Sequence, residues 1–550
     1  MTSTGILSGG CLPKRAGAAA RGDLTRRLAL LILALVVIRV ALPLALLHPA
    51  WEFHRDELLY FAMGDHLELW RMQFPPFVPA IAAASKAIFG VSVWAARVPA
   101  ALGGGALLLC MLSVVHALGG RTFALTLTAI ASVASPVFVR ASVLMQPVIF
   151  DLVWAQLALL GVVLACVRSN PRWWVLTGVA IGIGTLTKFS APLYGILIGV
   201  TALVVPATRT HVRTQWPWIA LAAALAVGSP SLVGQHLHHW PFFAQLKVLR
   251  AGQLTHVSAA DYFGGQFQML GAAAIPMAAG VWSALALFRR RSPLDERDED
   301  AARARSALGF VLLFALLIIG WYFVMRGKPY YAAIAYPMLI AAGIVELEAR
   351  ISTRIHRTTE RALQSVLMTA VTIGAIVLLP FGIPCFPPLT MVRYAAALGV
   401  GTTTNDGITL ALPQDFADML GWRSEADALA RAWKTLAPED RARATISGGN
   451  YGQVAALAMY GPARGLPYPV STRSDFWAWG PGPHNGDPTL VALTADDYDG
   501  YRSIWSSLTE LAFVRDSLRV VEERDVRIIL LRGIRTPLAK LWQQRGPGWD

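Results

Sequence analysis

The chain has 550 residues, of which 55% are hydrophobic and 15% are charged, and its mean hydropathy is +0.49. A soluble domain averages about 25% charged residues, so this composition excludes an ordinary soluble enzyme and indicates that much of the exterior faces lipid. The net charge of +14 is typical of a membrane protein with basic cytoplasmic loops. Because the basic residues cluster in such loops, we expect no nucleic-acid partner.

Residues 1–27 are predicted to form a cytoplasmic tail. The first apolar run, residues 28–47, follows five basic residues: Lys14, Arg15, Arg21, Arg26 and Arg27. This order is typical of an uncleaved first span with its N-terminus inside. Residues 48–97 then form the first loop outside the cytoplasm. Within it, residues 77–89 are apolar but too few to cross a bilayer, so we predict a helix lying in the interface.

Apolar runs near bilayer-spanning length continue to about residue 383 and predict a polytopic α-helical membrane protein with about eleven spans. After the first, the approximate spans are 98–116, 122–139, 150–167, 173–187, 191–208, 216–232, one ending at 289, 308–325, one ending before 350, and 366–383. Ten basic residues remain outside in this threading: Arg55, Arg71, Lys86, Arg97, Arg140, Lys188, Lys247, Arg250, Arg326 and Lys328. An anionic ligand would explain positive charge on that side.

The composition changes from about residue 384, after which no span-length apolar run occurs. An amphipathic stretch, residues 415–436, predicts a helix, and residues 489–493 and 526–531 have a β-strand composition. We therefore predict three parts: the tail 1–27, a transmembrane domain 28–383, and a C-terminal extracytoplasmic α+β domain 384–550.

An acidic pair in the first outer loop is the strongest candidate for chemistry. Asp56 and Glu57 lie beside His54 and Arg55, an arrangement that suits a general base. Successive residues on a helix point about 100° apart, so one carboxylate would face a substrate while the other orients or binds. A solvated loop with a local ion pair is the alternative interpretation.

The acidic pair opens a series of short motifs. In chain order they are Asp56-Glu57-Leu58-Leu59-Tyr60, Arg97-Val98-Pro99, Gly182 to Ser190 with Lys188, Gln235 with His238-His239-Trp240-Pro241, Gly327-Lys328-Pro329-Tyr330-Tyr331, Asn450-Tyr451-Gly452 and Trp477-Ala478-Trp479-Gly480-Pro481. Together they resemble the polyprenyl-phosphate-sugar glycosyltransferases of the GT-C superfamily. These include protein O-mannosyltransferases (glycosyltransferase family 39) and lipid A aminoarabinose transferases. Phe74 and Pro75 stand where the aminoarabinose branch has a lysine before proline, which argues against that branch and its acceptor.

The resemblance implies a membrane glycosyltransferase, mannosyltransferase-like, in the plasma membrane of a bacterium. It would move a hexose or pentose, with inversion, from a polyprenyl phosphate to a hydroxyl of a protein, glycan or lipid outside the cytoplasm. The resemblance also assigns the base to Asp56, the positioning of donor or acceptor to Glu57, and lipid-phosphate binding to Lys188, Arg326 and Lys328. Further candidates are His54, Tyr60, Asp151 and His238. Lys188 has a second interpretation as a lysine snorkelling to the interface, and the 326–328 loop as one that merely happens to be basic.

No organic cofactor is expected, and the sequence leaves a metal requirement open, because no cluster of ligands demands one. The histidines at 236, 238 and 239 lack a carboxylate at matching spacing and fit an interfacial aromatic belt better. The four cysteines, at 11, 110, 166 and 385, lack the spacing of a zinc or redox motif. Gly103-Gly104-Gly105 is not followed by Lys-Ser/Thr, so it predicts close helix packing rather than a phosphate loop.

Two other classes of function remain open at this point. A transporter or flippase of lipid-linked sugars would favour broken helices at the bilayer midplane and internal repeats, and no repeat is visible in the sequence. A non-catalytic scaffold or receptor would leave Asp56, Lys188 and Lys328 without a purpose.

Overall fold

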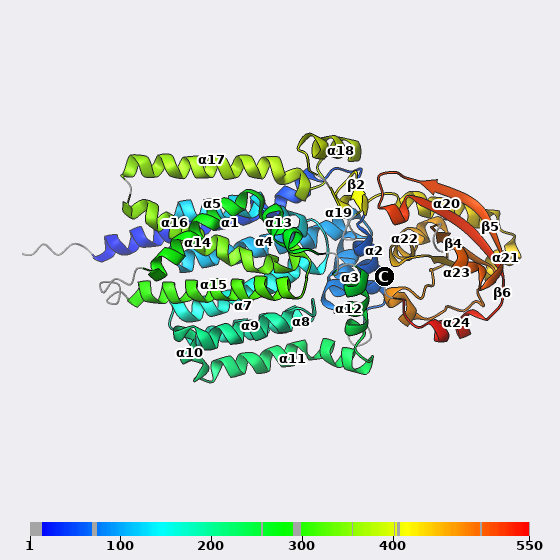
Figure 1. The fold of residues 1–550 in the computed structure, drawn as a ribbon, viewed down its shortest axis with the longest axis horizontal. Coiled ribbons are helices and arrows are strands. Elements are labelled where there is room, and N and C mark those ends of the chain that lie inside the picture. Colours follow the sequence, from blue (N-terminus) through cyan, green and yellow to red (C-terminus); the bar gives the residue numbers. More distant parts are fainter. Residues whose placement is uncertain are drawn as a thin grey trace, which may run out of the picture.

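The computed structural model describes residues 14–68, 74–252, 254, 257–289, 299–354, 356–400, 402–403, 408–494 and 498–548. The chain folds into a long bundle of helices with a smaller domain of helices and strands at one end of it (Figure 1). This arrangement confirms the predicted fold class, a polytopic helical protein with a C-terminal domain that contains a small sheet.

The bundle is built from elements of very different length. They are α1 (Lys14–Leu46), α2 (Arg55–Asp65), α3 (Phe77–Phe89), α4 (Val93–Ala117), α5 (Thr122–Ala134), α6 (Pro136–Ala141), α7 (Pro147–Val167), η1 (Pro171–Trp173), α8 (Trp174–Thr185), α9 (Ala191–Val204), α10 (Pro206–Val212), α11 (Trp216–Leu237), α12 (Pro241–Gly252), α13 (Ala259–Leu270), η3 (Gly271–Ala273), α14 (Ala274–Arg289), α15 (Glu299–Val324), η5 (Pro329–Ala335), α16 (Tyr336–Arg354) and α17 (Arg357–Gly382).

Among the described residues, seven helices are long and apolar enough to cross a membrane, or eight if α9 and α10, bent by 108°, count as one span. The predicted count of eleven is therefore not confirmed. Several predicted spans consist of shorter pieces, because proline interrupts them or the helix is brief. Residues 122–139 form α5 and α6, separated at Ser135, since Pro136 disfavours a helical residue before it. The predicted helix at residues 77–89 is α3.

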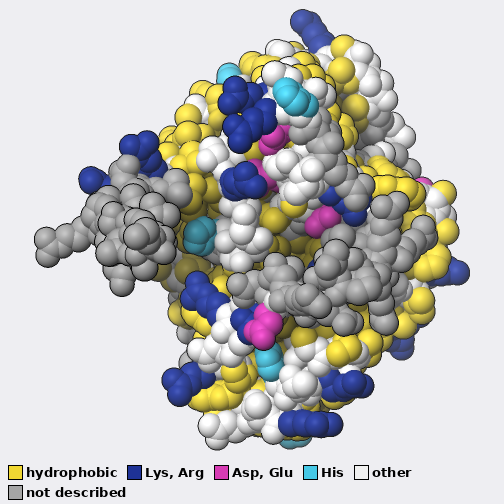
Figure 2. All heavy atoms as spheres, turned by 90° about the vertical axis from the view of Figure 1, so that its left-hand side faces the viewer, with side chains coloured by type: hydrophobic (Ala, Val, Ile, Leu, Met, Phe, Trp, Pro, Cys, Tyr) yellow, Lys and Arg dark blue, Asp and Glu magenta, His cyan; other side chains and the backbone are white. Residues whose placement is uncertain are grey.

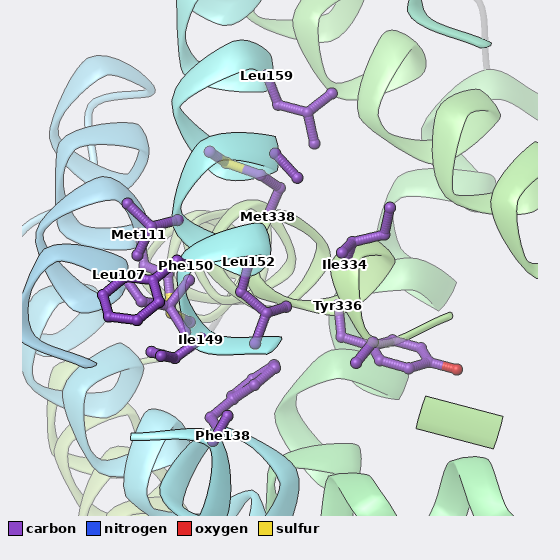
Figure 3. Close-up of a cluster of buried hydrophobic side chains, with 14 of the residues drawn as sticks. Leu107, Met111, Phe138, Ile149, Phe150, Leu152, Leu159, Ile334, Tyr336 and Met338 are labelled. Atoms are coloured by element: carbon purple, nitrogen blue, oxygen red, sulfur yellow. The ribbon is translucent and has the colours of Figure 1, made fainter. Parts of the chain in front are cut away.

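α7 lies at the centre of the bundle. In the most apolar 18-residue stretch of α7, 83% of the residues are buried. The same share is 11% in α1 and in α17, which lie at the periphery of the bundle. Figure 3 shows Ile149, Phe150 and Leu152 of α7 among side chains from α4 and α16, including Leu107 and Met338. A helix enclosed in this way cannot shift without disrupting its packing, so α7 is a rigid support for the residues at its N-terminus.

Glycines allow close helix approach in this bundle, as the Gly103–Gly105 run predicts. A Cβ on Gly103 would stand 2.8 Å from Ile149 of α7. The closest approach is at Gly178 of α8, where an added Cβ would fall on the backbone of Ala220 in α11.

Gly178→Ala is expected to destabilise the protein by about 1–3 kcal/mol, because backbone cannot yield to the added methyl group. Gly199→Ala in α9 is the matched control, since an added Cβ there meets nothing within 4 Å. Thermal unfolding in detergent should show a lower midpoint for Gly178→Ala and an unchanged or raised one for Gly199→Ala. Equal midpoints would contradict the close α8–α11 contact.

The end of the bundle remote from the C-terminal domain carries basic side chains amid apolar surface (Figure 2). Arg121, Arg168, Arg172, Arg209 and Arg213 are exposed in the connections there. The length of α7, 21 residues, separates Arg168 from the α7 N-terminus by about 30 Å at 1.5 Å per residue. The basic connections thus gather on one side of the bundle, as the charge pattern predicts.

The C-terminal domain contains a four-stranded sheet in the order β3-β4-β6-β5, in which β3 and β4 are parallel and the other pairs antiparallel. Its strands are β3 (Thr445–Gly448), β4 (Thr489–Leu493), β5 (Trp505–Arg515) and β6 (Asp525–Ile534), and a two-stranded ladder joins β1 (Thr402–Thr403) to β2 (Thr409–Leu410). Its helices are α18 (Pro388–Ala397), α19 (Gln414–Ala417), α20 (Trp422–Thr435), α21 (Pro438–Arg443), α22 (Tyr451–Tyr460), η6 (Pro462–Arg464), η7 (Ser474–Trp479), α23 (Tyr498–Arg502), η9 (Val521–Glu523) and α24 (Leu538–Arg545).

Both predicted strands, 489–493 and 526–531, are present as β4 and within β6. The predicted helix at 415–436 is instead two helices, α19 and α20, separated at Gly421 with φ of +80°. α19 ends at Ala417, and the left-handed Gly421 is the N-cap from which α20 starts. Asp418, between the two helices, lies next to the start of α2, where it pairs with His54 and Arg55.

Candidate active site

The N-terminus of α2 forms a capping box. His54 is the N-cap residue, and its Nδ1 accepts a hydrogen bond from the Asp56 N–H at 3.1 Å, while Glu57 Oε2 accepts from the His54 N–H at 2.9 Å. Acidic residues in the first turn are also favoured by the helix dipole. Asp56 and Glu57 diverge as the helix requires, because the Asp56 side chain is 31% exposed and that of Glu57 is 0% exposed.

Glu57 is held by groups of the protein. Its Oε1 lies 3.0 Å from Arg97 Nη1 and accepts the Met145 N–H at 3.0 Å, in addition to the His54 bond. Arg97 is itself 2% exposed. Glu57 is expected to help position donor or acceptor; a fully buried carboxylate with these three partners can do so only through other residues. Glu57 connects α2 to the loop before α7.

Arg97→Met is expected to destabilise the protein by about 3–5 kcal/mol, since it leaves the buried Glu57 carboxylate without a cation. Arg527→Met breaks an exposed pair, with side chains 39% and 41% exposed, and should cost about 0–1 kcal/mol. Thermal or denaturant unfolding of both variants in detergent measures the difference. Similar stabilities for the two variants would contradict a structural role for the Glu57–Arg97 pair.

Asp56 receives a hydrogen bond on each carboxylate oxygen. Gln146, just before α7, donates its Nε2 to Oδ2 at 2.8 Å, and Tyr451 of α22 donates its hydroxyl to Oδ1 at 2.8 Å. Each carboxylate oxygen has two lone-pair sites, so these bonds leave acceptor capacity on both. Asp56 is thus a fixed, partly exposed carboxylate at the junction of the bundle and the C-terminal domain.

A network of ion pairs next to Asp56 joins α2 to the C-terminal domain. Arg55 lies 3.2 Å from Glu523 Oε1 and 3.6 Å from Asp418 Oδ1, and Arg519 joins Glu523 to Glu425 at 2.5 and 3.2 Å. Burial raises the pKa of Asp418 to about 6, against the opposing effects of Arg55 and His54. Since every member is largely buried, the network ties α2 firmly to the C-terminal domain.

Lys188 stands on the same end of the bundle, in the turn between α8 and α9. Its Nζ is 3.5 Å from Asp151 Oδ2, which also accepts the Tyr194 hydroxyl at 2.9 Å. The ammonium lies 5.2 Å and 5.8 Å from the ring centres of Tyr331 and Tyr330. Asp151 is buried, whereas the Lys188 side chain is 28% exposed, so the lysine is oriented by the protein and still open on one side.

Tyr330 lies near both Asp56 and Lys188. It bears the Lys188 ammonium on its ring and lies within electrostatic range of Asp56. Asp56 and Lys188, which are 132 positions apart in the sequence, thus both lie in the neighbourhood of one aromatic side chain.

The remaining candidates occupy varied positions. Arg326 is exposed after α15 with φ of +53°, and Lys328 is 9% exposed at the start of η5. His54 is buried, with its Nε2 3.7 Å from Asp418 and 3.8 Å from Asp415. Tyr60 is buried against Phe74, whereas His238 is exposed at the end of α11. His54 and Tyr60 support the site from within α2 and its cap.

The positive charge assigned to the outer side has a different explanation from the one expected. In the part of the chain that the structure describes, at least five of the ten basic residues pair with carboxylates of the chain itself: Arg55, Lys86, Arg97, Arg140 and Lys188. Arg71 lies outside the described residues. The charge excess alone therefore no longer requires an anionic ligand, and the argument for one depends on Lys188 and the 326–328 loop.

Two residues of the site were not singled out by sequence reasoning, Gln146 and Tyr451. Tyr451 lay in the Asn450-Tyr451-Gly452 motif but had no role assigned, and Gln146 carried no local signal. Across the described part of the chain, no group of three or more His, Cys, Asp or Glu side chains is placed to hold a metal ion.

Comparisons with known proteins agree with this architecture. Residues 73–233 match the family described as dolichyl-phosphate-mannose-protein mannosyltransferase. This segment contains Gln146, Asp151 and Lys188, whereas Asp56 precedes it. A search of curated protein sequences gave no match.

Two solved structures of ArnT from Cupriavidus metallidurans resemble the chain along nearly its whole length. With ArnT bound to undecaprenyl phosphate the TM-score is 0.54 at 17% identity, covering 91% of this chain and 97% of that one. With the apo state the TM-score is 0.55 at 18% identity, covering 93% and 98%. At these identities the likeness concerns the fold. The structural likeness shows that the chain has the fold of these ArnT structures, and the family match to dolichyl-phosphate-mannose-protein mannosyltransferase lies within it, at residues 73–233.

Proposed function

We propose that the protein is an inverting glycosyltransferase that moves a sugar from a polyprenyl phosphate to an acceptor hydroxyl outside the cytoplasm. The observation that carries this proposal is that a partly exposed Asp56 carboxylate, fixed by Gln146 and Tyr451, and the Lys188 ammonium, fixed by Asp151, both lie in the neighbourhood of Tyr330. A partly exposed carboxylate and an oriented ammonium are the two groups that displacement of a sugar from a phosphate requires.

In the proposed reaction the acceptor oxygen attacks the anomeric carbon on the face opposite the phosphate. The bond from carbon to the phosphate oxygen breaks, and its electron pair leaves with the polyprenyl phosphate. Asp56 takes the proton of the acceptor hydroxyl, and Gln146 and Tyr451 hold its carboxylate in place at 2.8 Å each. The products are the glycosylated acceptor, with inverted anomeric configuration, and polyprenyl phosphate.

Lys188 is proposed to stabilise the negative charge of the donor phosphate. Asp151 and the two tyrosine rings orient its ammonium, so little reorganisation is needed when the phosphate arrives. Arg326 and Lys328, on the loop that leads into η5, are proposed as further ligands of the same phosphate. The solved ArnT structure with undecaprenyl phosphate supports a donor of this class.

Glu57 is proposed to act indirectly. Through the Met145 N–H it fixes the loop that carries Gln146, and Gln146 in turn orients Asp56. The reaction as proposed takes its base and its phosphate-stabilising cations from protein side chains, so we expect no organic cofactor.

We further propose that the bundle crosses the plasma membrane of a bacterium with its arginine-rich end in the cytoplasm. The exposed arginines of the remote end support this orientation, because short cytoplasmic loops are enriched in Lys and Arg (Figure 2). The N-terminus would then lie in the cytoplasm, and the C-terminal domain and the site outside.

The experiment is reconstitution of the purified full chain in liposomes with synthetic polyprenyl-phosphate hexoses and pentoses. Separate reactions supply a protein hydroxyl, a cell-envelope glycan or a lipid as acceptor. We expect consumption of at least one donor and a product whose anomeric configuration, read by NMR, is opposite to that of the donor. If no polyprenyl-phosphate sugar is bound or consumed, the proposed function is wrong, and retention of configuration would contradict the single-displacement mechanism.

A further inference from the structure

The hydroxyl that donates a hydrogen bond to Asp56 Oδ1 belongs to the C-terminal domain. Tyr451 is 395 residues from Asp56 in the sequence and is the first residue of α22 in the C-terminal domain. The four-stranded sheet and α20 contribute no other hydrogen bond to the Asp56 carboxylate among the described residues. The catalytic carboxylate proposed above is therefore oriented jointly by the bundle, through Gln146, and by the C-terminal domain, through Tyr451.

Each residue of the Asn450-Tyr451-Gly452 motif contributes to this contact. Asn450 caps α22 and donates its Nδ2 to Glu523 at 3.0 Å, while Arg55 lies over the Tyr451 ring at 4.9 Å. Gly452 leaves room for Trp422 of α20, because a Cβ there would stand 3.0 Å from that side chain, and it lies in van der Waals range of Arg55 in α2, at 3.4 Å. Tyr451 is thus held on both sides, by its helix cap and by the cation above its ring.

The chemistry of the contact suits a neutral donor. Burial raises the pKa of Tyr451 well above its ordinary value, so its hydroxyl keeps its proton throughout the physiological range and donates to Asp56. Hydrogen bonds to an ionised carboxylate are stronger than those between neutral groups. Because Tyr451 and Gln146 are both uncharged, they orient the carboxylate without neutralising the charge that a base needs.

We infer that Tyr451 is a positioning residue for the transfer reaction, and that the C-terminal domain completes the catalytic site by supplying it. The inference rests on the proposed function, in which Asp56 is the base. According to this inference the C-terminal domain takes part in catalysis, because it orients the base. This role is separate from any role in binding an acceptor.

Tyr451→Phe in the full chain tests this inference, because it removes the hydroxyl and keeps the ring beneath Arg55. We expect kcat to fall about 10- to 100-fold, the range for loss of one hydrogen bond to a charged group that fixes a reacting atom, with the donor KM nearly unchanged. Tyr460→Phe is the matched control, since Tyr460 ends the same helix, and it should keep wild-type kcat. An unchanged kcat in Tyr451→Phe would overturn the inference.

The pH–rate profile adds a readout that a purely structural role would not move. Donors to an ionised carboxylate favour that form, so removal of one should shift the acidic limb of kcat to higher pH. Asp56 also faces His54, Arg55, Tyr60 and Tyr330, which both variants retain. A superimposable acidic limb in Tyr451→Phe would contradict the inference, as would an equal shift in Tyr460→Phe.

An infrared measurement separates failure of this inference from failure of the proposed function. The carboxylate stretch of Asp56 is identified as the band absent from Asp56→Asn, and we expect it to shift in Tyr451→Phe and to stay in place in Tyr460→Phe. This readout needs no substrate. If the band of Tyr451→Phe coincides with that of the wild type, the contact is absent and the inference is wrong, even in an active enzyme. If the band shifts but no donor is consumed by the wild type, it is the proposed function that fails, and with it the catalytic role of Tyr451.

Discussion

Asp56→Asn is expected to lower kcat for sugar transfer by about 10²–10⁴-fold, the range typical for loss of a general base. The amide has the shape of the carboxylate but cannot take the proton of the acceptor hydroxyl. The α2 cap should survive, since it uses the Asp56 backbone N–H and the Glu57 side chain. Donor consumption in liposomes gives the rate, and donor binding by calorimetry should stay close to that of the wild type.

Asp65→Asn is the matched control for this substitution. Asp65 ends the same helix and pairs with Lys86 at 2.7 Å, so the variant removes an equal charge from α2 without touching the site. It should retain nearly full activity. Full activity in Asp56→Asn would show that another group takes the proton, and equal losses in the two variants would show that general charge, rather than position, matters.

Lys188→Met is expected to lower kcat/KM by about 10²–10³-fold, because it removes a cation proposed to stabilise the departing phosphate. Lys86→Met is the matched control: its side chain is 29% exposed, against 28% for Lys188, and it too pairs with a carboxylate. The control should lose little activity, since Asp65 and Lys86 lie near the surface. Steady-state transfer rates at varied donor concentration measure both effects.

A complication of Lys188→Met is that it leaves the buried Asp151 without its cation. The double variant Asp151→Asn with Lys188→Met removes that unpaired charge and should recover thermal stability while remaining inactive. If the double variant also recovers activity, the loss in Lys188→Met comes from the stranded carboxylate, and Lys188 is not a phosphate ligand.

Local features of this fold could be predicted because they arise from neighbouring residues. β4 occurs at residues 489–493 and α3 at residues 77–89, since a short apolar β-branched run and an apolar run bounded by Pro76 and Gly90 each favour one conformation. Pro136 and Gly421 outweigh the periodicity around them. Each interrupts a segment that apolar periodicity alone treats as continuous.

Composition and periodicity were enough to predict a helical membrane protein with a C-terminal α+β domain, and helix geometry was enough to predict that Asp56 and Glu57 point in different directions, as it does for any adjacent pair. Which of the two carboxylates is exposed depends on the packing around them. Glu57 is buried and bonded to Arg97 and the Met145 N–H, whereas Asp56 is bonded to Gln146 and Tyr451 and stays partly exposed. These partners come from separate elements, up to 395 residues away. Contacts of that kind depend on how helices and domains pack, which periodicity along the chain does not encode.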